Sequence, residues 1–318
     1  MTTIEVKNLN LGFAVEDTFK QALFDVSYTI EEGKTLALVG ESGCGKTMSA
    51  MSILNLIPKT ARITSGEILY NGEDLLKLSQ EEMRTYRGKR IAYIPQDPMT
   101  SLNPLYTVGD QLLEIIKIHR NLYGKEAEQK AIESFEQVQI PDSKERLKSY
   151  PHEFSGGMKQ RVIIAMALAC NAKVIIADEP TTALDVTIQA QIMKLLNEIK
   201  ETNNTSILLI THDLALVREN SDKIAVMYAG RIVEQAECEE FFTHPNHPYS
   251  KALIKSIPTN KNTRLQTIKG QPPTISDKID GCRFNPRCDF CTNKCKTNIP
   301  QLLEISQNHY SACFLNTV

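Results

Sequence analysis

Residues 40–47 have the types and spacing of a phosphate-binding loop. The stretch reads Gly40-Glu41-Ser42-Gly43-Cys44-Gly45-Lys46-Thr47, with Met48 next, and satisfies Gly-x-x-x-x-Gly-Lys-Ser/Thr. Glycines let the backbone close around a phosphate with its N–H groups inward, and the following helix start adds positive potential. Lys46 is expected to bridge the β- and γ-phosphates of a nucleotide, and the Thr47 hydroxyl to bind Mg²⁺. A Gly-rich turn that matches by chance is the alternative, which the strand before it and the helix after it disfavour.

Two adjacent acids form a second candidate site. Asp178 and Glu179 end the apolar run 174–177. A carboxylate at the end of a buried strand is costly unless it meets a cation. Asp178 is therefore a candidate Mg²⁺ ligand, and Glu179 a candidate base that orients and deprotonates a water molecule near the γ-phosphate. A solvated strand end is the alternative, and the phosphate-binding loop in the same chain argues against it.

Five of the eight cysteines are crowded between Cys282 and Cys313. In a cytosolic protein this distribution is typical of a metal site, and four thiolates suit either an iron–sulfur cluster or tetrahedral zinc. Cys288 and Cys291 form a Cys-x-x-Cys pair that zinc also accepts. Disulfides are disfavoured because ATP chemistry implies a reducing cytosol. Free thiols in a loose tail are the remaining alternative.

The apolar pattern predicts the elements that position these residues. Alternation over the first 35 residues predicts strands, and the continuous run 35–39 predicts a strand buried on both faces. We expect further strands at 65–70, 91–95, 174–177 and 206–211, helices at 47–57, 108–147 and 187–202, and a hairpin at 223–236 that turns at Ala229–Gly230. Strands that alternate with helices indicate an α/β fold with a mostly parallel sheet, here interrupted by a helical insertion.

The bulk composition restricts the class of protein. Lys and Arg total 36 against 38 Asp and Glu, which gives a net charge of −2. No basic excess points to nucleic acid as a partner. The N-terminus lacks the apolar stretch of a signal peptide. No apolar run approaches the roughly 18 residues that span a bilayer, so any role at a membrane is expected to depend on partner subunits.

The segment before the two acids resembles the signature motif of ABC ATPases. It reads Phe154-Ser155-Gly156-Gly157-Met158-Lys159-Gln160-Arg161, with Met158 where the general motif has Gln. Gln96 resembles the Q-loop glutamine that contacts Mg²⁺ and water, Asp185 the D-loop aspartate, and His212 the switch histidine that contacts the γ-phosphate. Phe13 matches the aromatic residue that stacks on adenine. By this resemblance Ser155, Gly156, Gly157 and Met158 face ATP bound to the other subunit of a dimer.

The resemblance covers roughly residues 3–236 and implies the P-loop ABC ATPase fold, with antiparallel strands at the N-terminal side. We expect an ATPase domain at 1–236, in which 97–160 is the helical subdomain that carries the signature, and a Cys-rich extension at 237–318. Three further stretches resemble the ATPase subunits of oligopeptide and dipeptide importers, related to those for nickel: 97–104, 247–250 and 281–288. In this branch the spacing of Cys282, Cys288, Cys295 and Cys313 is associated with a [4Fe–4S] cluster.

The resemblance implies an enzyme that couples hydrolysis of ATP, bound with Mg²⁺, to peptide uptake. Its expected partners are a second ABC ATPase subunit, two integral membrane permease subunits and, indirectly, a solute-binding protein. The expected location is the cytoplasmic side of the cell membrane, as a peripheral subunit. Three alternatives stay open: an importer for nickel or another small solute, a soluble ABC ATPase with no membrane partner, and a non-enzymatic regulatory subunit. The single cassette disfavours the second, and the intact Glu179 and His212 disfavour the third.

Overall fold

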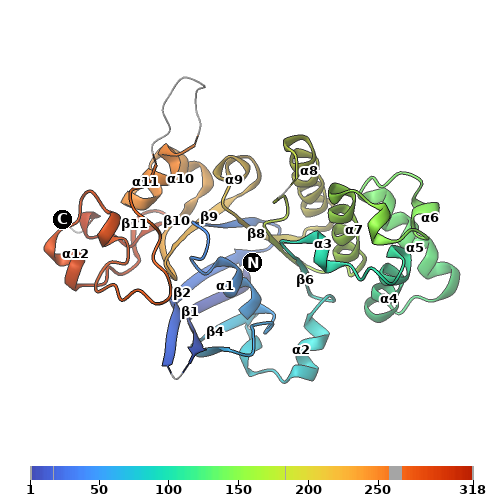
Figure 1. The fold of residues 1–318 in the computed structure, drawn as a ribbon, viewed down its shortest axis with the longest axis horizontal. Helices are drawn as coiled ribbons and strands as arrows, with labels where there is room; N and C mark the ends of the chain where they lie inside the picture. Colours follow the sequence, from blue (N-terminus) through green and yellow to red (C-terminus); the bar gives the residue numbers. More distant parts are fainter. Residues whose placement is uncertain (1, 17, 183, 258–266, 317–318) are drawn as a thin grey trace. The chain divides into compact units, whose positions relative to one another are not determined.

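A computed structural model describes residues 2–16, 18–182, 184–257 and 267–316 (Figure 1). The chain divides into two compact units. The first consists of residues 1–77 and 210–318, and the second of residues 78–209. The first unit therefore contains the phosphate-binding loop together with the C-terminal extension, and the second contains the predicted signature segment.

Two groups of strands form the first unit. A four-stranded antiparallel sheet has the order β2-β1-β4-β5, with bounds Thr18–Glu31, Thr2–Val15, Ala61–Tyr70 and Glu73–Asp74. A second group runs β11-β12-β10-β9-β3, with bounds Leu303–Ser306, His309–Ser311, Arg231–Glu237, Lys223–Tyr228 and Thr35–Val39. β3 and β9 are parallel, and the other pairs in this group are antiparallel.

The helices of the first unit are short. They are α1 (Lys46–Ile53), α9 (Leu214–Asn220), α10 (Cys238–Thr243), α11 (Pro248–Lys255), α12 (Asn293–Thr297) and the 3₁₀ turns 75–77, Asn285–Arg287 and 314–316. The predicted hairpin is confirmed as β9 and β10, which turn at Ala229–Gly230. The extension also adds strands that the sequence did not predict, because β12 pairs with β10 and β11 with β12.

The C-terminal extension shares one hydrophobic core with the strand that precedes the phosphate-binding loop. Val39 of β3 belongs to the same buried cluster as Phe241, Tyr249 and Phe284. Figure 1 shows the orange and red segments of the extension beside β9 and β10. Because burial of apolar surface is the main favourable term in folding, the extension is expected to fold with this unit rather than as a loose tail.

The second unit is largely helical. It contains α2 (Gln80–Tyr86), α3 (Pro98–Ser101), α4 (Val108–Arg120), α5 (Gly124–Gln137), α6 (Ser143–Arg146), a 3₁₀ turn (Pro151–Glu153), α7 (Gly156–Ala169) and α8 (Val186–Asn203). The parallel strands β6 (Ile91–Ile94) and β7 (Val174–Asp178) pair with each other, and β8 (Ser206–Thr211) leads back to the first unit. The expected strands at 91–95, 174–177 and 206–211 are thus confirmed within a residue or two. The helical pattern expected at 108–147 is confirmed and consists of α4, α5 and α6.

Candidate functional site

The phosphate-binding loop has a backbone that only glycine permits at two places. A Cβ atom on Gly40 would lie 2.1 Å from the carbonyl oxygen of Met227, and one on Gly45 would lie 2.6 Å from Leu23 Cδ2. Gly45 also has a φ of +108°, in the left-handed region, and directly precedes α1. The loop therefore closes tightly between β3 and the start of α1, as an anion-binding loop requires.

Lys46 is buried, and its ammonium group is held by the loop itself. Its Nζ atom donates hydrogen bonds to the carbonyl oxygens of Gly40, at 2.8 Å, and Glu41, at 3.1 Å. An ammonium group has three donors, so this arrangement points a buried positive charge at the loop interior. Thr47 and Met48 follow in the first turn of α1 and are half-buried. Strand, loop, lysine and helix together define a P-loop protein of the nucleotide-binding class.

Phe13 and His212 also lie in the first unit. Phe13 is half-buried on β1, opposite Lys20 and Ala61 in the neighbouring strands. His212 is exposed directly after β8, and the Thr211 hydroxyl beside it accepts a hydrogen bond from the Asp213 N–H at 3.0 Å. Their predicted roles, stacking on adenine and contacting the γ-phosphate, stay predictions.

The two acids end a buried strand in the second unit. Asp178 is fully buried and accepts a 2.9 Å hydrogen bond from the Tyr93 hydroxyl. Burial and the neighbouring carboxylate both raise the pKa of Tyr93, so the tyrosine stays a donor at neutral pH. Because a buried carboxylate is costly unless it meets a cation, Asp178 remains a candidate cation ligand.

Glu179 is held in an unusual conformation. Its φ is +46°, which is uncommon for a residue with a side chain and is typical of functional sites. Its carboxylate accepts hydrogen bonds from Gln96 Nε2 at 3.1 Å and from the Thr182 hydroxyl at 2.8 Å. The structure therefore brings together Gln96 and Glu179, which the sequence predicted separately. Thr182 was not predicted, although it lies only three residues before the predicted Asp185.

The predicted signature and D-loop residues begin two helices that touch. Ser155 caps α7, and its hydroxyl accepts a hydrogen bond from the Met158 N–H at 3.3 Å. Asp185 caps α8, and its carboxylate accepts one from the Ile188 N–H at 3.0 Å. A Cβ on Gly157 would lie 3.0 Å from Ile188 Cγ2, so the glycine allows the two helices to approach. Two exposed helix starts lie together here, and each favours negative charge.

Four of the clustered cysteines line one small cavity in the first unit. These are Cys282, Cys288, Cys295 and Cys313, the four predicted from spacing, and Cys291 is not among the lining residues. All are free thiols. Burial raises the pKa of Cys282 to about 11 and also raises the pKa values of Cys288 and Cys313. In the described part of the chain, no three His, Cys, Asp or Glu side chains are arranged as a metal site.

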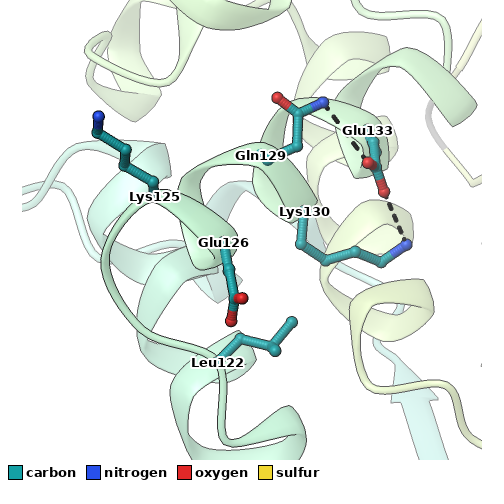
Figure 2. A pocket seen from close by; sticks show the side chains of 6 residues that line it. All are labelled: Leu122, Lys125, Glu126, Gln129, Lys130 and Glu133. Carbon is teal, nitrogen blue, oxygen red and sulfur yellow. Dashed lines mark hydrogen bonds and ion pairs between the residues drawn. The ribbon is translucent and has the colours of Figure 1, made fainter.

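A hollow on the surface of α5 contains none of the predicted site residues. It is lined by Leu122, Lys125, Glu126, Gln129, Lys130 and Glu133 (Figure 2). Figure 2 shows Glu133 engaged by its helical neighbours, with Lys130 Nζ at 3.1 Å and Gln129 Nε2 at 3.5 Å. Pairs three and four residues apart stabilise a helix surface, so these contacts are explained without a ligand.

Comparison with known proteins identifies the family. The family model described as ABC transporter matches residues 23–182, and the one described as oligopeptide/dipeptide transporter, C-terminal region, matches residues 233–295. The chain is 47% identical to a probable peptide ABC transporter ATP-binding protein of Sinorhizobium fredii, over 98% of this chain and 94% of that protein. It is 45% identical to the dipeptide transport ATP-binding protein DppD of Escherichia coli, over 98% and 96%.

Solved structures support the same assignment. The dimeric ATP-binding cassette MJ0796, in a post-hydrolysis state bound to ADP and Pi, matches with a TM-score of 0.67 and 27% identity, over 74% of this chain and 98% of that one. The chain belongs to the ABC transporter family, in the branch of ATP-binding subunits that carry the oligopeptide/dipeptide C-terminal region. The expected ABC ATPase fold and the ATP-hydrolysing activity are thereby confirmed. None of the helices in the described ranges is long and apolar enough to cross a bilayer.

Proposed function

We propose that this chain is the ATP-hydrolysing subunit of an importer for oligopeptides or dipeptides, bound at the cytoplasmic side of the cell membrane. The observation that carries the proposal is the combination of a P-loop ABC cassette with the peptide-transporter C-terminal region in one chain. Relatives that align over almost its whole length are named as peptide, dipeptide and oligopeptide transport ATP-binding proteins.

The proposed nucleotide chemistry assigns a role to each of the predicted site residues. Lys46 and the loop N–H groups would bind the phosphates of ATP, and Thr47 and Asp178 would hold its Mg²⁺, which would neutralise charge on the phosphates. Glu179, oriented by Gln96 and Thr182, accepts a proton from the attacking water. Water oxygen bonds to the γ-phosphorus, the bond from that phosphorus to the ADP oxygen breaks, and ADP and phosphate leave. His212 contacts the γ-phosphate, and Phe13 stacks on adenine.

A second ATPase subunit completes the site. The helix α7 begins with the predicted signature residues Ser155, Gly156, Gly157 and Met158. The start of a helix favours an anion, so we assign these residues to the phosphates of ATP bound to the other subunit. Asp185 and Val186 start the neighbouring helix, and Val186 is 81% exposed. The partner subunit is a second copy of this chain or a paralogue.

Two permease subunits are the proposed membrane partners, and a solute-binding protein acts through them. The segment that follows Gln96 carries three exposed large apolar side chains, Met99, Leu105 and Tyr106. These three side chains are the candidate contacts with a permease. Because this segment directly follows a residue that contacts Glu179, movement at the catalytic carboxylate is passed to the docked permease.

The four-cysteine cavity is proposed to hold a [4Fe–4S] cluster. Four free thiols, Cys282, Cys288, Cys295 and Cys313, line one cavity, and four thiolates are the usual ligands of such a cluster, although the described side chains are not arranged as a metal site in this structure. Protein purified without oxygen is expected to be brown and to contain iron and sulfide. Cys288→Ser should lose them, whereas Cys291→Ser, outside the cavity, should retain them. Zinc alone, or equal loss in both variants, would contradict the cluster.

Purification from the native membrane in mild detergent tests the proposed function. Two polytopic subunits and a solute-binding protein with bound peptide are expected to accompany the chain. A binding protein with bound nickel or another small solute would show that the importer carries that solute and not peptides. Recovery of soluble partners alone would leave the ATPase and reject the importer.

A further inference from the structure

Arg287, in the Cys-rich extension, reaches the phosphate-binding loop. Its guanidinium forms two hydrogen bonds with the Glu41 carboxylate, from Nη1 at 2.6 Å and from Nη2 at 3.0 Å. Its Nε donates to the Lys269 carbonyl at 2.8 Å, and Nη1 also donates to the Tyr228 hydroxyl at 3.3 Å. The Arg287 side chain is only 5% exposed. The Glu41 side chain is 25% exposed. A bidentate arginine–carboxylate pair of this kind fixes geometry as well as contributing energy.

The extension holds Glu41 through its backbone as well. The Glu41 N–H donates a 3.0 Å hydrogen bond to the hydroxyl of Tyr249 on α11. Tyr249 is fully buried, and its ring packs against those of Tyr228, at 4.6 Å between centroids, and Phe284, at 5.3 Å. The Glu41 carbonyl in turn accepts a hydrogen bond from Lys46. One loop residue is therefore fixed at its side chain, its N–H and its carbonyl.

Charge gives this arrangement a second consequence. Glu41 places a carboxylate in a loop whose ligand is a polyanion, and like charges at close range oppose each other. Arg287 neutralises that carboxylate and engages both of its oxygens. Pro272 and Pro273 of the extension also line a small cavity with Ser42 and Cys44 of the loop. The loop thus gains both neutrality and rigidity from a segment more than two hundred residues later in the chain.

A Gly-rich loop loses much conformational freedom when it is ordered around a phosphate, and prior ordering improves affinity by reducing that cost. We propose that Arg287 and Tyr249 are positioning residues for ATP binding, which hold Glu41 and the loop N–H groups in the binding geometry. This inference rests on the proposed ATPase function of the same loop. It assigns to the C-terminal extension a part in the affinity for ATP, besides any role of its cysteines.

The test compares KM for ATP with kcat in the full-length chain. Arg287→Ala is expected to raise KM for ATP about 10-fold with kcat nearly unchanged, because the contact is made equally before and during the reaction. Arg287→Lys should restore part of the affinity, since lysine keeps the positive charge but cannot form the bidentate pair with the carboxylate. Arg283→Ala is the matched control: this arginine lies in the same segment, packs over Phe24 at 4.3 Å, and is expected to leave KM unchanged.

Two further variants keep the test informative if Arg287→Ala folds poorly. Tyr249→Phe retains the ring packing and removes only the hydroxyl that accepts from Glu41, so KM should rise about 3-fold. In a Glu41→Ala background, Arg287→Ala should change KM for ATP little further, because the two residues act through one contact. Equal KM values in all these variants and wild type, additive effects, or a fall in kcat alone would overturn the inference. A wild-type chain that neither binds nor hydrolyses ATP would instead overturn the proposed function.

Discussion

The phosphate-binding loop and the signature region of this ATPase differ in burial and in the contacts that hold them. Around the loop, Lys46 and the Arg287 side chain are each 5% exposed, and the C-terminal extension contacts the loop from within the same chain. In the second unit, Gln96, Ser155 and Asp185 are all exposed, and the last two are held mainly as caps of their own helices. The first region is held by a distant segment of its own chain, whereas the described contacts of Ser155 and Asp185 in the second are local.

This difference predicts a division of labour between affinity and turnover. A loop that is ordered before ATP arrives contributes binding that is the same in the ground state and the transition state, so it sets KM. Residues that act on the attacking water or arrive with a partner subunit contribute in the transition state, so they set kcat. Variants in the two regions should therefore fall into two kinetic classes, and a variant of the wrong class would break the comparison.

The largest effect is expected at Glu179. Glu179→Gln removes the base while keeping a side chain that hydrogen-bonds with its neighbours, so kcat should fall by roughly 10²–10⁴-fold. ATP should still bind, because the loop contacts are intact. Single-turnover hydrolysis and the equilibrium affinity for ATP, measured on the same preparation, separate the two quantities.

Glu201→Gln is the matched control for this change. Glu201 is an exposed carboxylate near the end of α8, and its substitution should leave kcat and KM at their wild-type values. Retained turnover in Glu179→Gln would remove Glu179 as the base. A large loss of ATP affinity in that variant would show instead that the two regions are not functionally separate.

Ser155→Arg tests the claim that the second region needs a partner subunit. A bulky cation at the cap of α7 should block ATP-dependent dimer formation and weaken it by at least about 10-fold. Binding of ATP to the single chain should be unchanged. Size-exclusion chromatography with ATP, in a Glu179→Gln background that does not consume it, measures the dimer directly.

Asn203→Arg is the matched control for Ser155→Arg, because Asn203 lies at the far end of α8, away from the helix starts at Ser155 and Asp185. It adds the same charge on an exposed residue roughly 25 Å along the helix from Asp185, and should leave the dimer intact. If Ser155→Arg dimerises as well as Asn203→Arg does, the signature helix does not contribute to a site in the other subunit.

The sequence predicted the parts of this site that follow from local spacing. The loop pattern, the strand before it and the acids that end β7 all lie in short segments, where periodicity and residue type carry the information. The contact between the C-terminal extension and the loop could not be predicted in this way. Arg287 and Glu41 are 246 positions apart, and nothing in either segment indicates the pairing.

Backbone conformation was equally hidden. Glu179 adopts φ = +46°, although its residue type does not favour positive φ, and the contacts with Gln96 and Thr182 that accompany this conformation depend on the surrounding structure. The strands β11 and β12 were missed because each is short, and β12 pairs with β10 far away in the sequence. Tyr249 was noticed only as part of a family-like stretch, since its contact with the loop depends on the packing of Tyr228 and Phe284.

The smallest predicted effect concerns how the extension is attached to the first unit. The buried carboxylate of Glu234, on β10, accepts hydrogen bonds from the backbone N–H groups of Asn246 and His247 at 2.8 and 2.7 Å. It also pairs with His309 Nε2, on β12, at 2.8 Å. The hydrogen bond with Glu234 raises the pKa of His309, with Glu240 adding to the effect. Burial lowers the pKa of the neighbouring His247 to about 4.

The sign of the pH dependence follows from the direction of the shift. Because the pKa of His309 is higher in the folded chain than the unfolded value of about 6.5, its charged form stabilises the fold fully below that pH. The stabilisation is lost as pH rises through the raised pKa. His309→Gln keeps a neutral donor to Glu234, so it should lower the free energy of unfolding by about 1 kcal/mol at pH 6 and by less at pH 8.5. The contribution of His247 is present in both proteins and cancels in the difference.

His244→Gln is the control, at an exposed histidine that also contacts Glu240, and it should change the free energy of unfolding little at either pH. Denaturant unfolding at the two pH values gives the comparison, and a difference that grows with pH would mean that the Glu234–His309 pair does not hold the extension by charge.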